Sequence, residues 1–210
     1  MAQTLIERIR GRSPTPDAAA ERRRSVRHTT VFQVARAITA DWQELCILRN
    51  VSPGGLKAEI YMPAAVGERI TVEIKTGHSL QGHVVWAHEH SVGVQFDVEV
   101  PMMAMLAHCS ADERIGRIRP PRIDVDLAGT LRLDHDEVPV RVLNISQAGM
   151  RLTVDAPLGI DARCEIRLPE LGWKRACVRW YRGGEAGVML VQPLLYPEFA
   201  AWRRALHGIG

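Results

Sequence analysis

The second half of the chain repeats the first half at a distance of 94 residues. From Asn50 to Val94 the two halves align without a gap. The identical pairs are Asn50/Asn144, Ser52/Ser146, Gly55/Gly149, Pro63/Pro157, Arg69/Arg163, Val84/Val178, Trp86/Trp180, Gly93/Gly187 and Val94/Val188. Chance rarely aligns Trp, Gly, Asn, Ser and Pro together, so we infer an internal duplication. Each copy is long enough to form a core of its own, which a short solenoid repeat is not.

The first copy has the pattern of short β-strands. Apolar and polar residues alternate over 56–60 and again over 68–75, as they do in half-buried strands. Other β-rich runs cover 29–38, 44–49, 80–87 and 92–98. Aromatic residues make up only 5% of the chain, so the cores must consist mainly of aliphatic side chains. Strands of this length and spacing predict an antiparallel barrel or sandwich.

Helical patterns close both copies. Residues 101–108 predict a helix, and residues 197–206 repeat that pattern near the C-terminus. The predicted organisation is an N-terminal tail over 1–20, a first domain over 21–109 and a second domain over 110–210.

Two polar motifs stand out in the first copy. The first is an arginine run, Glu21 to Arg27, in which Arg23 and Arg27 are four residues apart. Guanidinium groups offer a planar fork of donors that suits phosphate oxygens and the O6/N7 edge of guanine. Taken alone, the run also fits a solvated basic linker or a non-specific nucleic-acid patch.

The second motif is Asn50-x-Ser52-x-x-Gly55, which we interpret as part of a tight polar turn over residues 49–55. Asn and Ser side chains can bond to nearby backbone, and Gly54 and Gly55 permit a positive φ and a close approach of the backbone to a ligand. A capped hairpin turn would account for this motif equally well. The conjunction of both motifs in one predicted barrel is more specific than either motif.

Together, Arg23-x-x-x-Arg27 and Asn50-x-Ser52-x-x-Gly55 in a small β-rich domain resemble the PilZ domain. The resemblance covers residues 21–109, and the variant of the turn motif that starts with Asn lies within the family pattern. It implies two tandem six-stranded antiparallel β-barrels in a mainly β chain, each barrel followed by a short C-terminal helix. It also implies binding of the bacterial second messenger cyclic di-GMP.

The resemblance further implies roles for single residues. Arg23 and Arg27 would hold the phosphates and guanine edges, with Arg22 adding a stacking or phosphate contact. Asn50 and Ser52 would bond a guanine or the ligand backbone, and Gly55 would leave room for the ligand. Outside the motifs, Lys57 could reach the same pocket because it follows Gly55 by two residues. Trp86 could stack near the ligand, although packing alone would also explain this tryptophan.

The second copy keeps the turn motif, Asn144-x-Ser146-x-x-Gly149, but not the arginine motif. Arg23 aligns with Arg117, whereas Arg27 aligns with Pro121. Arg119 and Arg122 lie nearby at the wrong spacing, and Pro120-Pro121 stiffens the segment. The second copy is therefore expected to be degenerate in ligand binding and to pack on the first domain, mediate a homodimer or contact a downstream partner.

The remaining features argue against other function classes. No run approaches the eighteen or so apolar residues of a membrane span, and the N-terminus lacks a signal-peptide core, so a cytoplasmic protein is expected. The four cysteines are scattered and predict free thiols. His88-x-His90 has no evident third ligand, so no metal is expected. No nucleophilic triad or phosphate-binding glycine loop indicates an enzyme, and no cofactor is expected.

Three functions remain. The first is a cyclic di-GMP receptor whose arginine segment becomes ordered on binding and whose output is a contact with motility, secretion or polysaccharide-synthesis machinery, in motility or biofilm regulation. The second is an adaptor or structural interaction protein that does not bind the nucleotide. The third is a nucleic-acid-binding barrel, which the net charge of only +3 and the scarcity of aromatic residues disfavour, so no nucleic-acid partner is expected.

Overall fold

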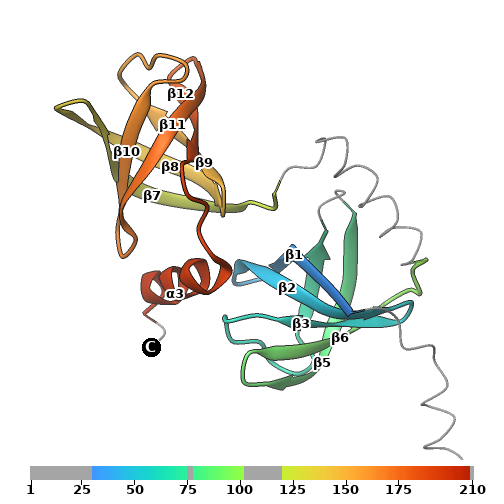
Figure 1. The fold of residues 1–210 in the computed structure, drawn as a ribbon. Coiled ribbons are helices and arrows are strands. Elements are labelled where there is room, and N and C mark those ends of the chain that lie inside the picture. Colours follow the sequence, from blue (N-terminus) through green and yellow to red (C-terminus); the bar gives the residue numbers. More distant parts are fainter. Residues whose placement is uncertain (1–29, 75–77, 102–119, 209–210) are drawn as a thin grey trace, which may run out of the picture.

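The computed structural model describes residues 30–74, 78–101 and 120–208. These residues form two closed β-barrels and a C-terminal helix, α3 (Figure 1). The predicted mainly β fold with two tandem six-stranded antiparallel barrels is confirmed.

The first barrel contains six antiparallel strands. They are β1 (Thr30–Ile38), β2 (Gln43–Ser52), β3 (Gly55–Glu59), β4 (Arg69–Glu73), β5 (Ser79–His88) and β6 (Ser91–Phe96). Their order around the barrel is β1-β2-β3-β6-β5-β4, and β4 pairs back with β1. All six predicted strand runs are confirmed, with boundaries that move by a few residues. The longest extension is at β2, which continues to Ser52 rather than ending at Arg49.

The second barrel repeats this arrangement. Its strands are β7 (Ile123–Leu133), β8 (Asp136–Ser146), β9 (Gly149–Val154), β10 (Arg163–Leu168), β11 (Gly172–Arg182) and β12 (Glu185–Leu190). The order β7-β8-β9-β12-β11-β10 is that of the first barrel.

The two barrels share their irregularities as well as their strand order. The register between β1 and β2 shifts between Thr30 and Gln33, and that between β7 and β8 shifts between Asp124 and Leu127. The other two shifts also recur 94 residues later, at Leu48/Asn50 and Val142/Asn144, and at Val84/Trp86 and Val178/Trp180. Bulges re-aim side chains, so the two copies present equivalent positions on equivalent faces.

Each barrel encloses an aliphatic core, as the low aromatic content predicts. The first core is built from residues such as Leu48, Ile70 and Val84, and the second from residues such as Ile145, Leu152 and Val178. Inward residues alternate with exposed or half-buried ones along the strands, which leaves the outer faces for polar side chains.

Helix α3 (Tyr196–Leu206) confirms the predicted C-terminal helix. It begins with Pro197 in its first turn, where the missing N–H costs nothing, and Arg203 and Arg204 lie in its last turn. The helix predicted over 101–108 lies, apart from Pro101, outside the described residues. No helix within the described ranges is long and apolar enough to cross a membrane.

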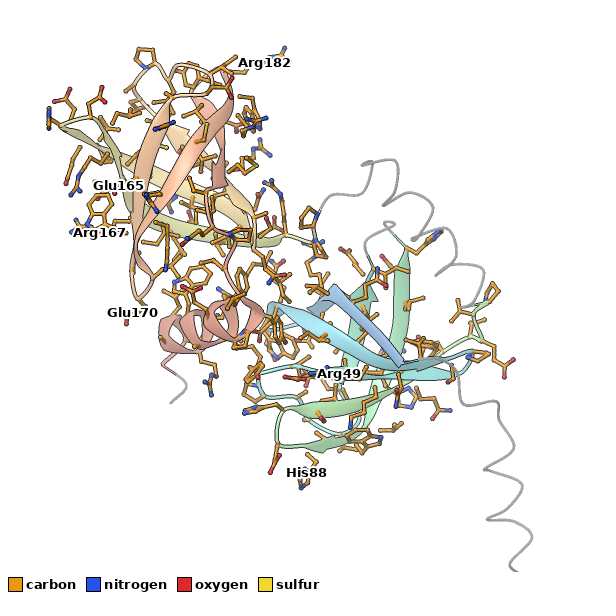
Figure 2. All side chains as sticks on the ribbon, in the orientation of Figure 1. Arg49, His88, Glu165, Arg167, Glu170 and Arg182 are labelled. Carbon is orange, nitrogen blue, oxygen red and sulfur yellow. The ribbon has the colours of Figure 1, made fainter. Side chains whose placement is uncertain are left out.

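One face of α3 packs against the core of the second barrel. Phe199 and Trp202 are buried in the second core, and the Trp202 Nε1–H donates to the Pro169 carbonyl at 2.9 Å. Figure 2 marks Glu170 in the β10–β11 turn, which reaches towards α3.

The other face of α3 contacts the first barrel. The Tyr196 hydroxyl shares its proton between the carbonyl oxygens of Leu45 at 3.2 Å and Glu59 at 3.0 Å. Arg203 donates to the Gln43 carbonyl at 3.3 Å, and Arg204 lies 5.4 Å from the centre of the Tyr61 ring. Helix α3 is therefore packed between the barrels.

A buried carboxyl group lies in this contact. Glu44 is 0% exposed, and neither carboxylate oxygen has a hydrogen-bond partner among the described residues. Burial raises the pKa of Glu44 to about 7, although the charges of Arg203 and Arg204 oppose the shift.

Candidate functional site

The motif Asn50-x-Ser52-x-x-Gly55 lies at one end of the β2–β3 hairpin. Only Pro53 and Gly54 form the turn, so the predicted polar turn over residues 49–55 was too wide. Asn50 and Ser52 are strand residues, and Asn50 is exposed beside the β2 bulge. The Ser52 hydroxyl donates to the Gly55 carbonyl at 3.0 Å and closes the turn.

Gly55 has a steric role in the fold. A Cβ at this position would lie 2.4 Å from the Val94 carbonyl oxygen on β6. Gly54, in contrast, would meet nothing within 4 Å. Neither glycine uses the positive φ that glycine permits, and the close approach at Gly55 is to the backbone of β6.

A row of four residues crosses the outer face of the first barrel next to this turn. Asn50 on β2 pairs with Lys57 on β3, Lys57 pairs with Gly93 on β6, and Gly93 pairs with Trp86 on β5. We call these residues the first-barrel row. It places an amide, an ammonium group and an indole side by side.

The glycine in the row lets the indole lie against the sheet. A Cβ on Gly93 would come within 2.0 Å of the Trp86 Nε1 atom. Trp86 nevertheless remains 40% exposed, and the Lys57 Nζ atom lies 5.7 Å from the ring centre. An exposed indole with an adjacent cation can stack on a flat, anionic ligand. The sequence interpretation singled out Lys57 and Trp86 but missed Gly93, although its recurrence at Gly187 was a signal.

An ion pair borders the row. Arg49 Nε donates to Glu59 Oε2 at 3.0 Å, and the Tyr61 hydroxyl donates to Glu59 Oε1 at 3.1 Å. Burial acts to raise the pKa of Glu59, but these hydrogen bonds outweigh it and hold the pKa below its ordinary value. The Tyr61 ring also stacks on His90 with ring centres 4.3 Å apart. Figure 2 shows Arg49 and, at the edge of the same barrel, His88.

Arg22, Arg23 and Arg27 lie outside the described residues. The structure does fix where their segment joins the barrel, because Thr30 at the start of β1 pairs with Asn50 on β2. The predicted motif residues Asn50, Ser52 and Gly55 are gathered at one hairpin end, with Lys57 and Trp86 beside them in the row.

The second barrel has an equivalent row. Asn144, Arg151, Gly187 and Trp180 pair in the same order, and Trp180 is also 40% exposed over its glycine. The Ser146 hydroxyl donates to the Gly149 carbonyl at 3.1 Å, as Ser52 does to Gly55. We call these four residues the second-barrel row. The turn hydrogen bond and the glycine are thus features of the fold in both copies.

The polar side chains of the second-barrel row form hydrogen bonds and an ion pair with other residues of the chain. Arg122 Nη1 donates to Asn144 Oδ1 at 2.9 Å. Arg151 forms a bidentate pair with Glu185, with contacts of 2.7, 2.9 and 3.1 Å. A site that needs these groups for a ligand would first have to break both interactions.

Other candidate chemistry is weak in the described residues. No group of three or more His, Cys, Asp or Glu side chains there could hold a metal ion. His88 ends β5 and His90 follows Glu89 in the turn, so they do not line one strand face. Cys46 and Cys164 are buried free thiols as predicted, Cys177 is half-buried, and Cys109 lies outside the described residues.

A surface cavity of about 480 Å³ lies on the second barrel, away from the first-barrel row. Its lining includes three arginines and three acidic residues, so the charges cancel. This balance does not fit a phosphate-bearing ligand.

The chain is similar to proteins with PilZ domains. The family model of the PilZ domain matches residues 21–111 and 116–194. No curated protein matches the chain.

Three solved structures illustrate the similarity. Borreliella burgdorferi PlzA, crystallised in complex with c-di-GMP, is 9% identical with a TM-score of 0.39, over 88% of this chain and 95% of that chain. The Bacillus subtilis inhibitor of motility MotI/DgrA is 11% identical with a TM-score of 0.34, over 86% and 99%. Escherichia coli YcgR in complex with c-di-GMP is 15% identical with a TM-score of 0.31, over 93% and 90%.

Proposed function

The chain belongs to the PilZ domain family, and on this basis we propose that it is a receptor for cyclic di-GMP that binds the nucleotide on its first barrel. The receptor is not an enzyme: it converts ligand concentration into a protein contact. The division of the chain into a first domain over 21–109 and a second domain over 110–210 is part of this proposal.

The proposal is supported by the position of Thr30, the first described residue after the arginine motif. Arg27 precedes Thr30 by three residues, and three residues span at most about 11 Å. Arg27 would therefore lie within this distance of Thr30, which pairs with Asn50 of the first-barrel row. Arginine forks and the row would then approach the ligand from two sides.

The chemistry of the two sides is complementary to a cyclic dinucleotide. In the proposed complex Arg23 and Arg27 bind the phosphates and guanine edges, and Arg22 adds a further contact. Asn50 and Ser52 bond the ligand, Lys57 offsets phosphate charge and Trp86 stacks on a guanine. Gly55 keeps β3 close to β6, so that the row stays intact.

Binding would draw the segment over residues 22–27 onto the barrel and change its outer surface. The output would be a contact with motility, secretion or polysaccharide-synthesis machinery. The same outer surface could also form a homodimer.

Calorimetric titration of cyclic di-GMP into the full chain tests the proposal. The double variant Arg23→Ala/Arg27→Ala removes at least two charge-assisted hydrogen bonds and should weaken binding by about 100-fold or more. Arg117→Ala, at the aligned position of the second copy, is the matched control and should bind like the unaltered chain.

Absence of binding by the unaltered chain would contradict the proposed function. Equal binding by the double variant would contradict the site assignment alone. A gel shift with DNA and RNA at physiological salt tests the nucleic-acid alternative, for which we expect no complex.

A further inference from the structure

The two rows differ in their cation, Lys57 against Arg151, and the residues that flank them on β6 and β12 also differ. Ser91 lies two residues before Gly93 on β6, and Glu185 lies two residues before Gly187 on β12. Residues two apart in a strand share a face, so Ser91 and Glu185 flank their rows on the outer surface. Because all register shifts are the same in both barrels, these positions are equivalent in space as well as in sequence.

In the second barrel the acidic residue neutralises the cation of the row. Glu185 accepts from Nε and Nη2 of Arg151, so its carboxylate takes both donors that face it. The pair leaves the second-barrel row without the net positive charge that Arg151 alone would give it. A phosphate that approached Arg151 would be repelled by the Glu185 carboxylate and would have to displace it.

In the first barrel the cation has no such partner. Among residues 30–74, 78–101 and 120–208 the Lys57 ammonium has no ion pair, and its described interaction is with the Trp86 ring. Ser91 carries no charge. The acidic residue of this region, Glu59, lies directly opposite Ser91 and is held by Arg49 and Tyr61.

We propose that the residue at this position, Ser91 in the first barrel and Glu185 in the second, determines which barrel can bind a dianionic nucleotide. This inference rests on the proposed function and refines it. Serine leaves Lys57 available to a phosphate, whereas glutamate closes the second-barrel row independently of its missing arginine motif. The chain then offers one binding surface per molecule.

The test is a calorimetric titration of cyclic di-GMP into full-length Ser91→Glu, with Ser91→Gln as the uncharged control of the same shape. A carboxylate at residue 91 would repel the phosphates and neutralise Lys57, so Ser91→Glu should bind at least tenfold more weakly. Ser91→Gln should stay within about threefold of the unaltered chain. The difference in affinity between Ser91→Glu and the unaltered chain should become smaller at 0.5 M salt, because salt screens charge and does not act on shape.

A second pair of variants covers the case in which Ser91→Glu, placed opposite Glu59, does not fold. Lys57→Met should weaken binding at least tenfold, whereas Arg151→Met at the equivalent position should leave affinity unchanged. Circular dichroism and thermal unfolding check the fold of each variant.

The outcomes separate the two ideas. If the unaltered chain binds but Ser91→Glu binds as well as Ser91→Gln, or Lys57→Met as well as Arg151→Met, the inference is overturned and the proposed function stands. If the unaltered chain does not bind, both are overturned.

Discussion

Gly54 in the β2–β3 turn and Gly55 at the start of β3 are adjacent but differ in their surroundings. Gly55 lies where its Cα faces the backbone of β6, and backbone cannot move aside as a flexible side chain can. Gly54 faces open space and has no positive φ. The requirement at Gly55 recurs at Gly149, where a Cβ would lie 2.4 Å from the Val188 carbonyl oxygen. The glycine of the motif is therefore needed by the barrel before any ligand binds.

This difference predicts unequal effects of the same substitution. Gly55→Ala should lower the free energy of unfolding by about 1–3 kcal/mol, because β3 and β6 must separate to admit the methyl group. Gly54→Ala is the matched control and should change it by less than about 0.5 kcal/mol. Urea unfolding of both variants measures the effect. A cost at Gly54 equal to that at Gly55 would contradict the steric explanation.

Helix α3 serves both barrels because its two faces differ in chemistry. Phe199 and Trp202 complete the apolar core of the second barrel. Tyr196, Arg203 and Arg204 instead meet backbone carbonyls, a carboxyl group and a ring on the first barrel. Tyr196 bridges β2 and β3 at the hairpin end opposite the Asn50 turn. The β2–β3 hairpin thus connects the candidate site to the contact with α3.

Tyr196→Phe should weaken this contact. The substitution leaves the carbonyl oxygens of Leu45 and Glu59 without their shared donor, which should cost about 1–3 kcal/mol of unfolding free energy. Tyr181→Phe is the control, because the described residues offer the Tyr181 hydroxyl no hydrogen bond. Thermal unfolding of both variants decides the point, and equal melting temperatures would show that the bridge does not stabilise the chain.

The contact between the barrels contains a carboxyl group, Glu44, that burial keeps protonated at higher pH than an exposed glutamate. Glu44 has a pKa of about 7 in the folded chain, against an ordinary value near 4.5. The folded chain therefore holds this proton more tightly than the unfolded chain. The contribution of Glu44 to stability falls as pH rises from about 4.5 to about 7, and it stays constant above that range.

Glu44→Gln should remove this dependence, since the amide does not ionise. Relative to the unaltered chain, the variant should gain on the order of 3 kcal/mol between pH 5 and pH 8, most of it below pH 7. Urea unfolding of both proteins at pH 5, 6, 7 and 8 measures the gap, and other titrating groups cancel in the comparison. A gap that does not change with pH would mean that Glu44 is not the buried carboxyl described above.

Much of this architecture follows from local pattern. Alternation of apolar and polar residues predicted the strands, and the repeat at 94 residues predicted two equivalent barrels. Motif spacing singled out Asn50, Ser52 and Gly55, which the structure gathers at one hairpin end, with Lys57 and Trp86 beside them in the row. The width of the turn was overestimated, because Asn50 and Ser52 have turn propensity but the ladder with β3 outweighs it.

The two barrels and the residues of the motif could thus be predicted from the amino-acid sequence alone, because they depend on neighbours along the chain and on periodicity. The sequence could not show that Gly93 seats Trp86, that Glu185 neutralises Arg151, or that α3 buries Glu44 between the barrels. Those features pair residues across separate strands or domains. Which charge meets which, and which carboxyl loses water, depends on folded geometry and not on sequence separation.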